Sequence, residues 1–404
     1  MSHRSPEGTL STRHLLGEVG HVVVAPDKFK GSLTAADAAR AISDGLTAVD
    51  PSIRICEFPI ADGGDGTVDM VLRQGFTAVT CQVTGPLQST LSATYGWKDG
   101  IAVIEMASTA GLSVLGTGVP NATTARTAST RGVGQLISDA LDRGARKIVL
   151  GVGGSATTDG GAGAVTALGG RIVDADGDSV YPCPSDLVFA HRLDLTGLDP
   201  RMADVELVVA CDVDNPLLGT HGASAVYAPQ KGADAHTVRL LDGALTRWAD
   251  VVADAVGNDV REVPGVGAAG GIAFGLHAVF GAALVSGIDL LLELTCFEDV
   301  LTDASLVIVG EGSLDEQSLR GKGPIGVAAS ARRAGVPAVA AVGRSSVTSE
   351  QATAAGLDEV YALADLEPDP VRSMAGARTL LVEVGTRIAR EYSTTPAAHR
   401  MDVR

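Results

Sequence analysis

Aromatic residues make up only 3% of this 404-residue chain, and long apolar runs are missing from it. No apolar run approaches the roughly 18 residues that a membrane-spanning helix needs, so we expect no membrane insertion. The first residues of the chain are polar and mixed in charge, without the apolar core of a secretory signal. We therefore expect residues 1–20 to be a disordered N-terminal extension.

Cysteine is scarce, and its pattern excludes several kinds of site. The chain has five cysteines, an odd number, with no C-x-x-C pair among them. Its eight histidines show no metal-ligand spacing. These features argue against a disulfide framework and a structural zinc site, and they are typical of a reducing cytosol. We therefore expect a cytoplasmic protein.

Basic residues are too few to balance the acidic ones. The chain has 31 Lys and Arg against 48 Asp and Glu, which gives a formal net charge of −17. Nucleic-acid-binding proteins usually carry a basic face and often stacking aromatic residues, so we expect no nucleic-acid partner. The same acidity repels an anionic substrate at long range. A site for such a substrate needs local Lys or Arg side chains, backbone N–H groups or Mg²⁺.

What the chain does have is a repeated pattern of apolar runs that end in polar loops. Near-continuous apolar runs are typical of parallel strands buried on both faces. In open α/β sheets, ligands bind at the carboxyl ends of such strands. The pattern therefore predicts an α/β fold whose polar loops form the active site. The apolar runs are residues 21–25, 147–150, 207–210, 306–309 and 338–342.

A change in the order of predicted strands and helices indicates an inserted domain. The first segments read as strand, helix, strand and helix, with a predicted helix that begins after Thr34 and extends to about Val49. From Phe76 to Ala107 three strand-like runs follow one another, and turns rather than a helix separate the first two. This stretch predicts antiparallel or mixed sheet at the start of a second domain.

A glycine-rich loop over residues 151–163, GVGGSATTDGGAG, follows a predicted strand and opens a helix. Glycines let backbone N–H groups approach phosphate oxygens, and a helix N-terminus favours an anion. We expect Gly153, Gly154, Ser155 and Thr157 to contact phosphate or substrate oxygens. Residues 151–156 also fit G-x-G-x-x-A, with Asp174 near the offset of a ribose-binding acid, so a dinucleotide site is an alternative. A purely structural turn is the third interpretation.

Carboxylates stand in three loops of the chain. Asp62 lies in a D-G-G-D-G loop, Asp212 follows a wholly apolar strand, and Glu311 and Asp315 share the segment EGSLD. Mg²⁺ prefers one or two carboxylates together with substrate phosphates and water, so these acids could hold it or accept a hydroxyl proton. Ordinary turn and helix-cap chemistry is the competing explanation for them.

Lysines and a second glycine loop complete the pattern. Asp27 and Lys30 stand at the end of the first strand, Lys231 lies in a QKG loop, and Lys322 precedes a predicted helix. Cations there suit a phosphate or carboxylate ligand. The glycine loop 265–271, GVGAAGG, lacks a clear preceding strand. It closes over a ligand or permits close helix packing. No Walker A motif occurs in the chain, which argues against a P-loop enzyme.

Taken together, these segments resemble the type I glycerate kinases, the bacterial family that phosphorylates D-glycerate with ATP. Any one motif is weak, but seven motifs occur in the same order and span roughly residues 22–390. The matching segments are 24–32 (VAPDKFKGS), 59–67 (PIADGGDGT), 151–163 (GVGGSATTDGGAG), 210–216 (ACDVDNP), 227–232 (YAPQKG), 264–271 (PGVGAAGG) and 309–327 (VGEGSLDEQSLRGKGPIGV).

The resemblance implies two α/β domains. One is a Rossmann-like, discontinuous domain with a parallel sheet, and the other contains mixed sheet and is inserted in it. The resemblance and the change to consecutive strands near Phe76 together predict a discontinuous domain of residues 21–80 plus 289–392 and an inserted domain of residues 81–288. We expect the tail, residues 393–404, to be disordered. The resemblance also implies an active site in a cleft between the two domains.

The resemblance further implies a Mg²⁺-dependent transfer from ATP to the C2 hydroxyl of D-glycerate, giving 2-phosphoglycerate. Asp212 is the candidate base or metal ligand and Asp62 its main competitor, while Glu311 and Asp315 are the candidate magnesium ligands. The candidate substrate-binding residues are Asp27, Lys30, Ser155, Thr157, Asn215 and Lys231. The candidate nucleotide- or phosphate-binding residues are Gly153, Gly154, Gly267, Gly270, Gly312, Ser313 and Lys322.

Two rival functions remain open at this point. A nicotinamide-dependent oxidoreductase would use the 151–156 loop with Asp174, but it leaves segments 59–67 and 309–323 unexplained. A non-catalytic metabolite-binding protein would bind glycerate without turnover, although acids beside the glycine loops would only repel the anion. The sequence does not give the oligomeric state, and a homodimer is one possibility.

Overall fold

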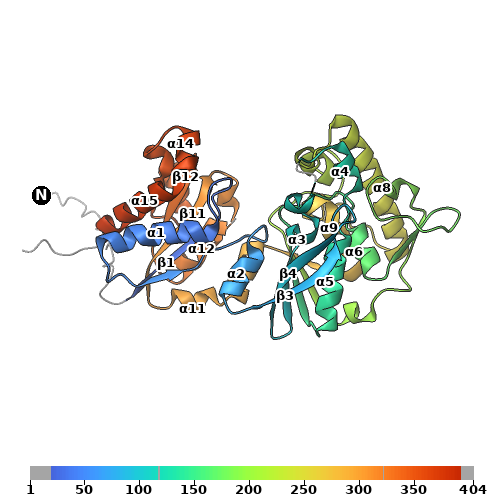
Figure 1. Cartoon of the computed structure of the whole chain (residues 1–404), viewed down its shortest axis with the longest axis horizontal. Helices are drawn as coiled ribbons and strands as arrows, with labels where there is room; N and C mark the ends of the chain where they lie inside the picture. Colours follow the sequence, from blue (N-terminus) through green and yellow to red (C-terminus); the bar gives the residue numbers. More distant parts are fainter. Residues whose placement is uncertain (1–19, 117–118, 322, 393–404) are drawn as a thin grey trace, which may run out of the picture. The chain divides into compact units, whose positions relative to one another are not determined.

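The computed structural model describes residues 20–116, 119–321 and 323–392, and its elements are shown in Figure 1. The chain divides into two units: unit 1 comprises residues up to Ile60 and from Cys296 onward, and unit 2 comprises Ala61–Thr295. The sequence placed these boundaries at 80/81 and 288/289 instead. Strand β3 (Thr77–Thr84) pairs along its whole length with β4 (Thr90–Lys98), so a boundary at residue 80 would cut a continuous ladder.

Unit 1 contains a five-stranded sheet in which every neighbouring pair is parallel. Its order is β13-β12-β11-β1-β2, so the strand that is first in sequence lies between the second and the third. This is the flavodoxin-like arrangement of a doubly wound fold, whose switch point lies between the first and third strands. The strands are β1 (His21–Pro26), β2 (Ile55–Glu57), β11 (Ala304–Leu314), β12 (Ala338–Ser345) and β13 (Glu359–Ala362).

The helices of unit 1 connect these strands as the sequence predicted. Helix α1 begins after Thr34, whose hydroxyl accepts the N–H of Asp37, and it ends at Val49 before Pro51. This confirms the predicted N-cap. The helices are α1 (Ala35–Val49), α11 (Phe297–Leu301), α12 (Gly323–Arg333), α13 (Ser349–Ala354), α14 (Pro370–Ala375) and α15 (Ala377–Tyr392).

Helices α1 and α15 pack backbone against backbone on the sheet of unit 1. A Cβ atom added to Gly45 would overlap the carbonyl oxygen of Val382, and one added to Gly385 would overlap that of Ile42. The two helices lie side by side in Figure 1 and share one apolar core with β1, β11 and β12. The close approach therefore depends on residues without a side chain.

Unit 2 contains a six-stranded mixed sheet in the order β10-β9-β6-β5-β4-β3. Strands β5, β6, β9 and β10 are parallel, and β3 and β4 extend the sheet as antiparallel strands. The α/β fold with one parallel and one mixed sheet is thereby confirmed. The further strands are β5 (Ile101–Glu105), β6 (Lys147–Gly151), β9 (Glu206–Ala210) and β10 (Ala283–Val285).

Two further strands of unit 2, β7 (Arg171–Val173) and β8 (Arg192–Asp194), form a separate antiparallel ribbon. Regular helical geometry in α9 starts only after Gly271, because Ala269, Gly270 and Gly271 have left-handed backbone angles. The helices of unit 2 are α2 (Thr67–Arg73), α3 (Ala107–Ala110), α4 (Ala122–Thr127), α5 (Arg131–Asp142), α6 (Ala162–Ala167), α7 (Ala223–Tyr227), α8 (Ala235–Val256), α9 (Ala268–Phe280) and α10 (Gly287–Leu294).

Two sequence predictions about strand ends were wrong. We expected the strand that begins near Leu306 to stop at Val309, but β11 continues to Leu314. We expected the run 338–342 to end in a loop, but β12 continues to Ser345. The ladder with β12 extends through the pairs Glu311–Val342 and Ser313–Arg344. The end of β11 was read as a loop because its glycines and acids break the apolar run, yet backbone pairing with β12 does not require apolar side chains.

A buried carboxylate within the glycine loop of unit 2 and a buried lysine beside it hold this loop in place. Asp159 is fully buried, and its oxygens accept the backbone N–H groups of Thr130, Gly161 and Gly163 as well as the Thr130 hydroxyl. The Lys231 ammonium is also buried and donates to the carbonyl of Thr157. Burial lowers the pKa of Lys231 to about 7, and the negative charge of Asp159 opposes this shift.

The helix pair α1–α15 gives a stability prediction. Gly385→Ala should lower the free energy of unfolding by about 1–3 kcal/mol, because the added methyl group overlaps the α1 backbone. The matched control is Gly243→Ala in α8, where a Cβ atom would meet nothing within 4 Å. That change should stabilise by about 0.5–1 kcal/mol through helix propensity. Calorimetric unfolding of both variants would measure the difference, and equal effects would contradict the packing account.

Lys231 gives a prediction of pH dependence. Between pH 7 and 10.5 the unfolded chain holds a proton on Lys231 that the folded chain has lost, so this group makes stability rise with pH across that window. Lys231→Met removes the effect. The urea midpoint of the wild type, relative to that of the variant, should therefore increase as pH rises from 7 toward 10. The control Lys98→Met, at an exposed position, should show the same dependence of the urea midpoint on pH as the wild type. A difference between the midpoints of the wild type and Lys231→Met that stays constant with pH would contradict the account.

Candidate active site

The four parallel strands of unit 2 deliver their following loops to one edge of the sheet. Strand β5 ends at Glu105, β6 at Gly151, β9 at Ala210 and β10 at Val285. Their registers pair Glu105 with Gly151, Gly151 with Ala210, and Ala210 with Val285, so the four carboxyl ends are level. This is the edge at which open α/β sheets bind ligands.

Asp212 and Asp62 meet at this edge around Gly287, the first residue of α10. The backbone N–H of Gly287 donates to Asp212 Oδ1 at 2.9 Å. A Cβ atom on Gly287 would overlap the carbonyl oxygen of Asp62 and would lie 3.2 Å from Asp212 Oδ2. The structure therefore brings the two carboxylate-bearing segments that the sequence singled out into the same part of unit 2.

The D-G-G-D-G loop lies directly on the glycine loop that follows β6. The N–H of Gly153 donates to the carbonyl oxygen of Gly63 at 3.2 Å. Cβ atoms added to Gly151, Gly153 and Gly154 would overlap atoms of residues 63, 64 and 65 respectively. These glycines therefore let two loops of the same chain pack closely together. The N–H of Gly153 is already engaged in a hydrogen bond within the protein.

Sequence reasoning missed Glu105 at the same edge. Its two carboxylate oxygens accept the N–H groups of Gly66 and Val68, at 3.1 and 3.2 Å, and so hold the start of α2. Burial raises the pKa of Glu105, and these two hydrogen bonds oppose the shift. The signal was present, because Glu105 ends an apolar run as the other loop acids do. The predicted strand continues to Ala107, so Glu105 is not recognised as its last residue.

The side chains of Ser155 and Thr157, within the glycine loop of unit 2, point into the protein, as does that of Lys231 beside the loop. All three are buried, and Lys231 binds the carbonyl of Thr157 as described above. The hydroxyls of Thr157 and Thr158 are buried without a hydrogen-bond partner in the described part of the chain. The arrangement makes Lys231 a support of this loop.

Asn215, Gly267 and Gly270 hold neighbouring loops to one another. The Asn215 amide donates to the carbonyl of His221 at 2.7 Å and accepts the hydroxyl of Tyr227. Gly267 donates its N–H to the Asn215 carbonyl at 2.9 Å. A Cβ atom on Gly270 would overlap the carbonyl of Thr157. The 265–271 loop thus packs closely against the first glycine loop and the loop after β9.

In unit 1 the candidate residues lie at the switch point of the sheet, where β1 and β11 are neighbours. The N–H of Asp27 donates to the carbonyl of Gly310 at 2.7 Å. A Cβ atom on Gly312 would lie 3.4 Å from the backbone nitrogen of Lys30. Ser313 accepts a hydrogen bond from Arg344 Nε at 3.1 Å. Asp27, Lys30, Gly312 and Ser313 are therefore brought together in one region.

Arg344 is a cation that the sequence analysis did not assign to the site. It lies in β12 opposite Ser313 of β11. Its place after the apolar run 338–342 was the available signal, since a charged residue at that end of a buried strand reaches the ligand edge of the sheet. Lys322 lies outside the described residues.

The proposed magnesium ligands differ in what they already bind. Asp315 Oδ1 accepts the N–H groups of Gln317 and Ser318, at 2.8 and 3.2 Å, which is turn chemistry. Glu311 lies within β11 and is half-buried. Across the described ranges, no group of three or more His, Cys, Asp or Glu side chains forms a metal site. These residues fit Mg²⁺ only in the manner of one or two carboxylates that share the ion with substrate phosphates.

The dinucleotide alternative is not supported by the strand arrangement. Its ribose-binding acid should end a parallel strand beside β6, but the neighbours of β6 are β5 and β9. Asp174 instead follows β7 of the separate ribbon, and its carboxylate accepts the N–H groups of Asp176 and Asp178. Asp174 therefore stabilises a turn away from the glycine loop's neighbouring strands.

No helix within the described ranges is long and apolar enough to span a membrane.

The chain matches known proteins over most of its length. The model of the glycerate kinase family matches residues 22–393. A glycerate kinase of Halalkalibacterium halodurans is 42% identical over 91% of this chain and 97% of its own length. A glycerate 2-kinase of Escherichia coli K12 is 41% identical over 85% of this chain and 90% of its own length.

A crystal structure agrees with these matches. It is that of a protein assigned as glycerate kinase 2 from Salmonella typhimurium LT2, and it superposes with a TM-score of 0.76 at 38% identity. The match covers 93% of this chain and 99% of that one. The resemblance seen in the seven motifs is confirmed by these comparisons, and the chain belongs to the glycerate kinase family, a family of phosphotransferases.

Proposed function

We propose that this protein transfers the γ-phosphoryl group of ATP to the C2 hydroxyl of D-glycerate in a Mg²⁺-dependent reaction, giving 2-phosphoglycerate. The observation that carries the proposal is that the Asp212 carboxylate and the backbone of Asp62 both approach Gly287 at the ligand edge of unit 2, in a chain that belongs to the glycerate kinase family. The Escherichia coli relative named glycerate 2-kinase supports the C2 position.

Asp212 is the proposed base. Phosphoryl transfer needs positioning, charge stabilisation and an acceptor for the hydroxyl proton. Asp212 receives one N–H bond from Gly287, which fixes the orientation of its carboxylate at the end of β9. Asp62 is its competitor for this role, and its Oδ1 accepts the N–H of Gly64 at 3.3 Å. Glu105 holds the other end of the same loop and so acts as a positioning residue.

The nucleotide is proposed to use the switch-point residues of unit 1. Gly312 and Ser313 would contact phosphate oxygens, and Glu311 with Asp315 would share Mg²⁺ with them. Lys30, a substrate-binding candidate in the sequence, lies beside Gly312 and is assigned here to the phosphates instead. When bound, the ion neutralises phosphate charge. In a chain of formal net charge −17, local cations such as Lys30 and Arg344 are needed to hold an anionic nucleotide. Asp27 would orient the lysine-bearing turn.

The residues of the two glycine loops are proposed to shape the D-glycerate site. Ser155, Thr157, Asn215 and Lys231 would support it, together with Gly153, Gly154, Gly267 and Gly270, whose close packing sets the loop positions. The homodimer and the cytoplasmic location remain predictions from the sequence.

The first test measures ADP formation by purified protein with ATP, Mg²⁺ and D-glycerate. ADP should form only when all three are present, and L-glycerate should be a poor acceptor. Folded protein that forms no ADP with D-glycerate would contradict the proposed function. An equal rate without any acceptor would indicate an ATPase and contradict it equally.

Asp212 can be tested against a neighbouring aspartate. Asp212→Asn should lower kcat by about 10²–10⁴-fold with little change in the KM for ATP, because the amide cannot accept the hydroxyl proton. The control Asp214→Asn, at an exposed position two residues on, should leave kcat nearly unchanged. If Asp62→Asn loses the activity and Asp212→Asn keeps it, the two carboxylates exchange roles.

A further inference from the structure

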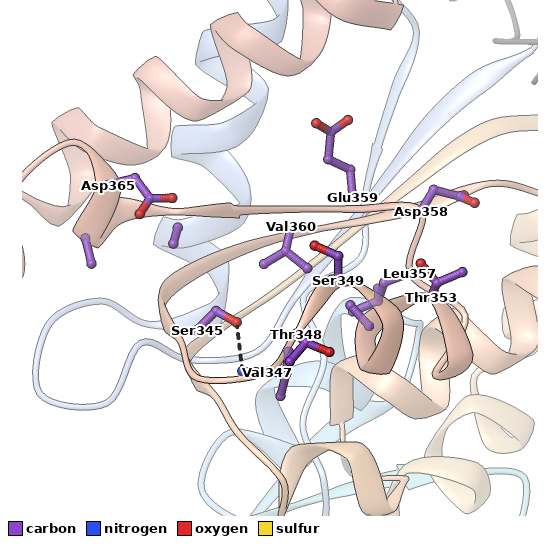
Figure 2. A pocket seen from close by; sticks show the side chains of 13 residues that line it. Ser345, Val347, Thr348, Ser349, Thr353, Leu357, Asp358, Glu359, Val360 and Asp365 are labelled. Atoms are coloured by element: carbon purple, nitrogen blue, oxygen red, sulfur yellow. Dashed lines mark hydrogen bonds between the residues drawn. The ribbon is translucent and has the colours of Figure 1, made fainter.

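A cavity of about 610 Å³ lies in unit 1 between helix α13 and the edge strand β13, beside the end of β12. Its volume falls within the roughly 300–1,000 Å³ that is typical of small-molecule sites. Figure 2 shows its lining from close by. The residues assigned above to glycerate and phosphate do not line this cavity, so it needs its own explanation.

Most of the cavity lining is polar, and its floor on β13 carries a narrow apolar strip. Val360 and Ala362 are two residues apart on β13, so they face the same side. Figure 2 shows Val360 pointing toward Ser345 and Thr348, whereas Glu359 points to the other side of the strand. Glu359 is engaged there with the hydroxyl of Tyr361. One face of a flat ring system with polar edge atoms suits this strip and the polar groups around it.

The carboxylates around the cavity are not equivalent. Asp358 accepts the N–H of Ala338 at 2.9 Å, so it fastens the start of β12. Asp365 stands beyond the carboxyl end of β13, at the end of the sheet where ligands bind. A carboxylate in this place can accept hydrogen bonds from ribose hydroxyls, as acids do in other doubly wound folds. The negative rim also repels phosphate from the cavity itself.

A line of polar groups leads from the cavity to the switch point. Ser345 lines the cavity, and Arg344, the residue before it in β12, donates a hydrogen bond to Ser313 on β11. Gly312 on β11 in turn lies beside the backbone of Lys30, after β1. Three adjacent strands span about 10 Å, which is comparable to an extended triphosphate. The path carries two cations, unlike the acidic rim.

We propose that this cavity binds the base and ribose of the nucleotide substrate, with the triphosphate running over the ends of β12 and β11 toward β1. Val360 forms the floor under the base, Asp365 meets the ribose hydroxyls, and Arg344 contacts the phosphates. The inference rests on the proposed function for the identity of the ligand, an adenine nucleotide, but it concerns unit 1 alone.

The test compares the same substitution inside and outside the cavity. Val360→Phe fills the floor, whereas Val371→Phe places the ring on α14 at a position that is 78% exposed. Calorimetric titration with ADP should show roughly tenfold or greater weakening for Val360→Phe and no change for Val371→Phe. The KM for D-glycerate should stay unchanged in both. Arg344→Ala should weaken ADP binding and leave adenosine binding as it is.

Folded Val360→Phe protein that binds ADP as tightly as the wild type would overturn the proposal. If that variant does not fold, photolabelling of the wild type with 2-azido-ADP decides, since the adduct is expected on the cavity lining and an adduct only elsewhere overturns the inference. Failure of the proposed function is a separate outcome. ADP binding that depends on Val360, without phosphorylation of D-glycerate, would leave the cavity assignment standing and remove the reaction.

Discussion

Close backbone approach at the ligand edge of unit 2 is the constraint on which the candidate site depends. The loop that carries Asp62 lies on Gly151 and Gly153, and its first carbonyl lies against Gly287, where a side chain of any size would overlap it. The same Gly287 donates its N–H to Asp212. The Asp212 carboxylate and the backbone of Asp62 thus share one small region because three neighbouring positions carry no Cβ atom. The density of glycine in these motifs is explained by packing before any ligand is considered.

The two units offer different chemistry at their strand ends. Asp62, Asp212 and Glu105 gather at the edge of unit 2, while Lys30 and Arg344 stand near the switch point of unit 1. An acidic region suits a group that takes a proton from an alcohol, and a cationic region suits phosphate. This difference supports assigning the acceptor chemistry to unit 2 and the nucleotide to unit 1. These cations would also let so acidic a chain hold the proposed nucleotide.

The sequence predicted the buried parallel strands well, because such strands leave a near-continuous apolar run, but it placed the ends of β11 and β12 too early. The sequence could not distinguish a glycine that lets a phosphate approach from one that lets another backbone approach, because the residue type is the same in both cases. Lys231 was predicted to bind substrate, and no local pattern reveals that it is buried and donates to the carbonyl of Thr157. Glu105 and the extension of β11 to Leu314 were missed for a related reason, because both depend on pairing partners distant in sequence.

The identity of the product tests the central claim most directly. Phosphorus NMR of a reaction of the wild-type protein with ATP, Mg²⁺ and D-glycerate reports both the phosphoryl group and the oxygen to which it is attached. We expect a 2-phosphoglycerate signal that grows with the ADP signal and needs both Mg²⁺ and D-glycerate. A 3-phosphoglycerate signal would keep the kinase and contradict the C2 assignment. The absence of any phosphorylated glycerate, from folded protein, would contradict the account as a whole.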